Sequence, residues 1–182
     1  MKIIGVLALV GGMLLPMHGQ GVKWMTIEEA QRKNKVQPRK ILVDVYTDWC
    51  GWCKKMDRDT YTNPAIVKII NENFYPVKFN AEQRASVVFK GKTYNFLAQG
   101  GRGVHEFAYM LLNGQMGYPA TAFIDGNLQV LGAVPGYRDA QGMEALLYYI
   151  LEEKYKAGIT LQQYEGEYIK NQNRKTSVPP TP

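Results

Sequence analysis

Cysteine and histidine are scarce in this chain of 182 residues, which contains two of each. A structural zinc site needs four ligands, commonly two cysteine pairs or a cysteine pair with a histidine pair. One of the histidines, His18, lies in a segment that we expect to be removed from the mature protein. The composition therefore argues against a zinc centre, and it leaves one pair of cysteines whose chemistry has to be explained.

The first apolar run, Ile3 to Leu15, is interrupted by glycine and is shorter than the about 20 residues that span a membrane. Lys2 precedes this run, and Pro16 and small or polar residues follow it. This organisation predicts a secretory signal peptide in residues 1–20 and a periplasmic, oxidising location for the mature protein. An uncleaved anchor or a buried N-terminal helix is the alternative.

Excess charge is modest, with a formal net charge of +6. Basic residues cluster at 32–40 and at 54–58 without a nucleic-acid-binding motif or interleaved aromatic residues, so we expect no nucleic-acid partner. A solvated basic face is the favoured interpretation, and weak attraction to anionic membranes or acidic partners is the alternative. The about 160 residues left after cleavage are enough for one domain with its own core.

The two cysteines follow a predicted buried strand. Residues 41–46 form an apolar run interrupted by Asp44, and the sequence Trp49-Cys50-Gly51-Trp52-Cys53-Lys54 comes next. If a helix begins here, positions i and i+3 share one face, which brings Cys53 within bonding reach of Cys50. The sulfur of Cys50 then lies at the helix N-terminus, where unpaired N–H groups and the helix dipole favour an anion.

This placement favours thiol–disulfide exchange, because helix N-termini in Cys-x-x-Cys motifs lower the thiol pKa. A sulfur of low pKa also leaves faster, so Cys53 can attack a mixed disulfide at Cys50 and release the partner. The reaction requires Cys50 to be accessible. A structural disulfide is an alternative, although closing so short a loop contributes only ~1.9 kcal/mol. A metal site and a pair of inert reduced thiols are the remaining alternatives.

The stretch from Val43 to Lys54 resembles the active-site region of the thioredoxin superfamily. A second stretch, 117–125, resembles the cis-proline loop of that family and the strand after it. The resemblance covers roughly residues 22–156 and implies an α/β, thioredoxin-like fold with a central mixed β-sheet flanked by helices. An insertion at 81–117, read as a hairpin plus a helix, precedes the proline and is expected to influence the choice of partner or merely to decorate an edge.

The resemblance also implies roles for individual residues. Cys50 and Cys53 would form the redox-active disulfide, with no other cofactor. Asp44 matches the buried acid of the family, and its desolvation should raise its pKa so that it exchanges a proton with Cys53. Lys78 resembles the lysine beside that acid, or it is an exposed strand lysine.

Substrate binding is expected around the two motifs. Trp49, Gly51 and Trp52 surround the cysteines in sequence. Pro119 would follow a cis peptide bond. The backbone of Tyr118 would pair with an extended segment of the substrate by β-augmentation.

Capping and periodicity predict the remaining elements. The thioredoxin-like domain is expected at 21–158, followed by a C-terminal helix at 159–171 and a disordered tail at 172–182. His105 is predicted to be a helix-surface or capping residue rather than a catalytic base. The other expected helices and strands are helices at 27–35, 64–71, 104–112 and 140–155, and strands at 74–79, 87–89, 93–96, 120–125 and 128–134.

The predicted function is that of a monomeric thioredoxin-like reductant of protein disulfides outside the cytoplasm, kept reduced by a membrane electron donor. Reduction potentials of such proteins run from about −270 to about −120 mV, and the two residues between the cysteines do not fix a position on that scale. A disulfide oxidase or isomerase is therefore an alternative. A peptide-binding module with an inert disulfide is another.

Overall fold

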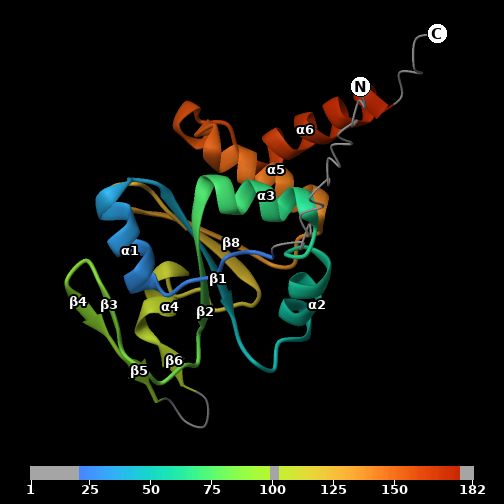
Figure 1. Ribbon diagram of the computed structural model, residues 1–182. Coiled ribbons are helices and arrows are strands. Elements are labelled where there is room, and N and C mark those ends of the chain that lie inside the picture. Colours follow the sequence, from blue (N-terminus) through green and yellow to red (C-terminus); the bar gives the residue numbers. More distant parts are fainter. Residues whose placement is uncertain (1–20, 99–102, 177–182) are drawn as a thin grey trace, which may run out of the picture.

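The computed structural model describes residues 21–98 and 103–176 (Figure 1). A four-stranded mixed sheet lies at its centre, with the strand order β2-β1-β7-β8. Strand β2 is parallel to β1, whereas β7 runs antiparallel to β1 and β8 antiparallel to β7. The predicted thioredoxin-like α/β fold is confirmed. The strands of this sheet are β1 (Lys40–Tyr46), β2 (Phe74–Asn80), β7 (Ala120–Ile124) and β8 (Val130–Pro135).

Strand β1 occupies the interior of the sheet because its residues 41–45 are buried on both faces. Two helices, α2 (Gly51–Asp59) and α3 (Pro64–Asn73), connect it to the parallel strand β2. The side chain of Asn63 accepts hydrogen bonds from the first N–H groups of α3, and Pro64 occupies the first turn, where no N–H is needed. The connection therefore ends one helix and begins the next in four residues.

Helices cover both faces of the sheet (Figure 1). One core lies between the sheet, α3 and α5 (Ala140–Leu151), and it includes Leu42 and Phe123. The other core lies between the sheet, α1 (Ile27–Val36) and the insertion, and it includes Val43 and Val45. The alternation of β1 side chains between these two cores follows from the two-residue period of a strand.

The insertion packs mainly against α1 rather than over the cysteines. It contains β3 (Val87–Phe89), β4 (Lys92–Tyr94), β5 (Phe96–Leu97), β6 (Val104–His105) and α4 (Glu106–Leu111). Side chains of α1 complete the free edge of the hairpin: Glu28 accepts the N–H of Val88, and Gln31 bonds the carbonyl of Val88 and the N–H of Lys90.

Helix α4 begins two residues later than predicted because His105 caps it. Its Nδ1 accepts the N–H of Phe107 at 3.1 Å, and its Nε2 lies 3.1 Å from the carbonyl oxygen of Ala85. His105 is fully buried. Of the two predicted roles, His105 therefore has that of a helix cap and not that of a surface residue.

The C-terminal region differs from the prediction. Helix α5 ends at Leu151, and a 3-10 turn, η1 (Lys154–Ala157), follows. Helix α6 (Leu161–Thr176) packs on α5 and continues past the predicted end at 171, so the start of the expected disordered tail is helical. Ring contacts between the two helices anchor it: Tyr168 stacks on Tyr148 with centroids 5.9 Å apart.

The expected signal peptide, 1–20, and the last six residues lie outside the described part of the chain. Among the helices within 21–98 and 103–176, none combines the length and the apolar character that crossing a bilayer requires.

Candidate redox site

The two cysteines form a disulfide at the start of α2. Cys50 is the N-cap residue of this helix, and its sulfur accepts the N–H of Cys53 at 3.0 Å. The Cα atoms of the two residues are 5.3 Å apart, one helical turn along the same face. The first sulfur thus lies at the positive end of the helix, as predicted, where a negative charge is stabilised.

The disulfide is more enclosed than predicted. Cys50 is 4% exposed and Cys53 2% exposed, so the expectation of an accessible first cysteine is wrong for this oxidised state. The sulfur of Cys50 is engaged by its bond to Cys53 and by the N–H that it caps. By contrast, Trp49 and Trp52, which adjoin the cysteines in sequence, expose 52% and 59% of their surface.

Each of these tryptophans packs against a tyrosine from another loop. The ring of Trp49 meets that of Tyr118 edge to face, with centroids 6.0 Å apart, and its Nε1 donates to Glu82 at 3.0 Å. The ring of Trp52 lies 5.3 Å from that of Tyr137. Glu82 belongs to the insertion, so the beginning of the insertion reaches the redox site even though its hairpin does not.

The predicted proline loop lies at the N-terminal end of β7. The peptide bond between Tyr118 and Pro119 is cis, and Pro119 is buried. The carbonyl oxygen of Pro119 accepts the N–H of Gly136 at 2.8 Å. Tyr118 is half-buried, and this burial, followed by the charge of Glu82, raises the pKa of its hydroxyl to about 12. Gly51, between the cysteines, is exposed.

Asp44 is buried in β1, six residues before Cys50, and only 2% of its side chain is exposed. Burial raises the pKa of Asp44 to about 6, against the lowering effect of the Lys78 charge. One carboxylate oxygen, Oδ1, has no hydrogen bond within the described residues. A carboxyl group with a pKa near neutrality can both accept and release a proton at physiological pH.

Lys78 lies beside Asp44, as the resemblance implies, because the two residues are register partners on the parallel strands β1 and β2. Its Nζ is 2.6 Å from Asp44 Oδ2 and forms a second ion pair with Asp57 of α2. The ammonium group also lies over the rings of Trp24, Tyr46 and Tyr61, at 5.3, 4.9 and 5.5 Å from their centroids. These rings provide favourable cation–π contacts for a partly desolvated charge.

Asp57 and Tyr137 were not predicted as site residues. Asp57 had a signal in the sequence, since it follows Cys50 and Cys53 by seven and four positions and so shares their helix face. Tyr137 had none, because the contact depends on how the end of β8 and the start of α2 meet in space. No cluster of three or more potential metal-binding side chains occurs in the part of the chain that the structure describes.

The local arrangement suits thiol–disulfide chemistry. The structure contains the three features that the sequence predicted for the site. They are a disulfide at a helix N-terminus, a titratable buried carboxylate on the preceding strand and a proline loop packed nearby. Residues 11–157 match a family model, Thioredox_DsbH, described as a protein of unknown function, DUF255. The chain belongs to the Thioredox_DsbH family.

One curated relative of this Thioredox_DsbH protein is much longer than the chain. An uncharacterised protein of Caenorhabditis elegans, B0495.5, is 27% identical over 149 residues, which are 79% of this chain and 18% of that protein. The chain thus spans less than a fifth of the length of this curated relative.

Two solved structures share the architecture. A thioredoxin from Thermus thermophilus has a TM-score of 0.56 and 15% identity, covering 77% of this chain and 95% of its own. A thioredoxin-fold protein from Helicobacter pylori has a TM-score of 0.54 and 18% identity, covering 75% and 86%. At such identities the similarity shows the fold alone.

Proposed function

We propose that this protein is a thiol–disulfide oxidoreductase that reduces disulfides of proteins outside the cytoplasm. The observation that carries the proposal is the position of Cys50 as the N-cap of α2, with its sulfur held by the N–H of Cys53 at 3.0 Å. The same N–H group and the helix dipole stabilise a thiolate after reduction, which makes Cys50 the nucleophile and Cys53 the resolving thiol.

In the reduced protein, the Cys50 thiolate attacks one sulfur of a partner disulfide. A mixed disulfide forms, and the other partner sulfur leaves as a thiolate. Cys53 then loses its proton and attacks the sulfur of Cys50, which releases the second partner thiolate and leaves the Cys50–Cys53 disulfide. Two electrons pass from the protein to the partner in this cycle.

Asp44 is the proposed acceptor of the Cys53 proton. With a pKa of about 6, the carboxyl group is mostly ionised at pH 7 and is available as a base. Lys78 holds this carboxylate from one side, and Asp57 shares the lysine. Lys78 therefore balances the charge of Asp44 without neutralising it completely.

Access to Cys50 depends on the surrounding side chains. Trp49 and Trp52 are more than half exposed, so they lie where an approaching partner would meet them. The partner backbone is proposed to pair with Tyr118 beside Pro119, and Trp49, Gly51 and Trp52 are proposed to contact the residues around the partner's cysteine. Substrate proteins, a periplasmic location, a monomeric state and a membrane electron donor that regenerates the dithiol belong to the same proposal.

Catalysed reduction of insulin disulfides by dithiothreitol tests the activity. We expect precipitation of the insulin B chain to accelerate with wild-type protein and not with Cys50→Ser. A wild-type protein that gives no acceleration would refute the proposed activity.

The low exposure of Cys50 favours one alternative, a peptide-binding module with an inert disulfide. Such a module would fail in the insulin assay, and its Cys50→Ser variant would bind partner peptides as the wild type does. The two readouts together separate a module from an enzyme.

A further inference from the structure

Three consecutive residues between β8 and α5 join separate parts of the redox site. The N–H of Gly136 donates to the carbonyl of Pro119 at 2.8 Å. The ring of Tyr137 packs on that of Trp52, between the cysteines. The carbonyl of Arg138 accepts the hydroxyl of Thr60, at the end of α2, at 2.6 Å.

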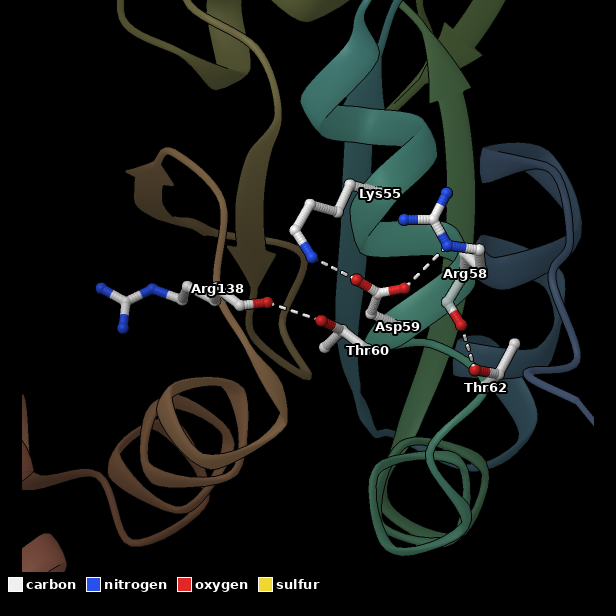
Figure 2. A network of polar contacts seen from close by, with 6 residues as sticks. All are labelled: Lys55, Arg58, Asp59, Thr60, Thr62 and Arg138. Atoms are coloured by element: carbon white, nitrogen blue, oxygen red, sulfur yellow. Dashed lines mark hydrogen bonds and ion pairs between the residues drawn. The ribbon is translucent and has the colours of Figure 1, made fainter.

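This segment is fixed from outside as well. The side chain of Arg138 is 17% exposed, and its guanidinium group forms an ion pair with Glu165 of α6. Figure 2 shows the Thr60 hydroxyl facing the Arg138 carbonyl while the arginine side chain extends away from α2. Tyr137 therefore enters the redox site from a backbone that is held at Gly136 and Arg138.

Tyr137 and Trp52 form a surface that we name the aromatic shelf. Their centroids are 5.3 Å apart with the rings tilted by 45°, and Lys55 Nζ lies 5.1 Å from the centroid of Tyr137. Lys55 is paired with Asp59 on the same helix, and Arg58 shares that carboxylate, as Figure 2 shows. The shelf itself consists of two aromatic rings, and Lys55 lies against the ring of Tyr137.

We propose that Tyr137 is a specificity-determining residue and that the aromatic shelf receives an apolar or aromatic side chain next to the partner's reactive cysteine. This inference rests on the proposed function, because it assumes a mixed disulfide at Cys50. The partner's sulfur must reach Cys50, and consecutive Cα atoms are only about 3.8 Å apart. A residue flanking the partner's cysteine therefore comes within reach of Trp52, two positions after Cys50.

Glutathionylated peptides test the shelf. Two peptides are compared, one with Phe and one with Ser at both positions flanking the modified cysteine, and their reduction by the reduced protein is followed by stopped flow. Aromatic pairs contribute about 0.5–1.5 kcal/mol, so the wild type should reduce the Phe peptide about 2- to 13-fold faster. Tyr137→Ala and Trp52→Ala should bring this ratio close to one, whereas Tyr137→Phe should preserve it.

Two further variants serve as controls. Tyr168→Ala removes a half-buried tyrosine of α6 that stacks on Tyr148, away from the shelf, and should keep the wild-type ratio. Tyr137→Leu keeps apolar bulk and serves as the substitute if Tyr137→Ala fails to fold. It should also lower the ratio of the Phe-peptide rate to the Ser-peptide rate. Circular dichroism checks the fold of each variant.

The outcomes separate the inference from the proposed function. A wild-type ratio of one, or an unchanged ratio in folded Tyr137→Ala or Tyr137→Leu, overturns the shelf while exchange itself persists. If the wild type reduces neither peptide nor glutathione disulfide, the proposed function fails, and the shelf fails with it.

Discussion

The ammonium nitrogen of Lys78 lies 2.6 Å from a carboxylate oxygen of buried Asp44 and is at the same time paired with Asp57. One cation thus serves two carboxylates, one enclosed in the sheet and one 42% exposed on α2. The charge that stabilises ionised Asp44 is divided, which leaves burial as the dominant influence on its pKa.

Replacing Asp44 by Asn should stabilise the protein at high pH. The pKa of Asp44 is about 6 in the folded protein against 3.8 for the unfolded chain, so ionisation opposes folding. Its unfavourable contribution is absent below pH 4 and grows as the pH rises through 6, reaching about 3 kcal/mol. Urea unfolding between pH 4 and pH 8 should show a gap between Asp44→Asn and wild type that widens with pH. A constant gap would contradict this account.

Replacing Asp57 by Asn should lower the pKa of Asp44. The variant removes a nearby negative charge and leaves Lys78 to pair with Asp44 alone. A 13C NMR titration of the Asp44 carboxyl measures the shift directly. Asp59→Asn is the matched control, because Asp59 lies on the same helix and pairs with Lys55 and Arg58 instead. Equal shifts in both variants would rule out a specific role for Asp57.

Replacing Lys78 by Met should act in the opposite direction. Both the charge of Lys78 and its hydrogen bond lower the pKa of Asp44, so removing them should raise it above the wild-type value. The same carboxyl titration follows the change, and the pH at which Cys53 resolves a mixed disulfide should move upward with it. A decrease in the pKa of Asp44 would show that Lys78 does not lower it in the wild type.

Cys53→Ser should accumulate mixed disulfides on Cys50. The serine oxygen cannot resolve the bond to the partner, so the intermediate persists. Non-reducing electrophoresis of extracts, followed by mass spectrometry of the adducts, detects it. Cys50→Ser should trap far less; equal trapping by both variants would contradict the assigned roles, and more trapping by Cys50→Ser would reverse them.

His105→Phe should lower the free energy of unfolding by about 1–2 kcal/mol, because the new ring keeps the contact with Phe79 but loses the cap of α4. Burial lowers the pKa of His105 below 6.5, so the neutral imidazole stabilises the fold above pH 6.5 and this contribution is lost as the pH falls. Wild type should therefore lose stability between pH 7 and pH 5 more steeply than the variant. Parallel losses would contradict the buried cap.

The local elements were predictable where neighbouring residues determine them. Thr26 and Glu29 mark the start of α1, and the hydroxyl of Thr26 indeed accepts the N–H of Glu29 at 3.2 Å. The apolar run of β1 likewise predicts a strand buried on both faces. The end of α6 was missed because the helix is held by tyrosine contacts with α5, and polar composition alone suggested disorder.

The site was predictable as far as motifs reach. The positions of Cys50, Cys53 and Pro119 follow from two short stretches, and Lys78 follows from the family resemblance. The low exposure of the disulfide depends on tertiary packing, and the contact of Tyr137 with Trp52 joins residues 85 positions apart. No local pattern encodes such a contact.

Equilibration of the mature protein with glutathione buffers tests the central claim most directly. The fraction of the Cys50–Cys53 disulfide is measured by alkylation and mass spectrometry at each ratio of reduced to oxidised glutathione. A reductant should show a reversible two-electron transition at a potential well below about −200 mV. A potential near about −120 mV would identify an oxidant instead, and a disulfide that never exchanges would contradict the account altogether.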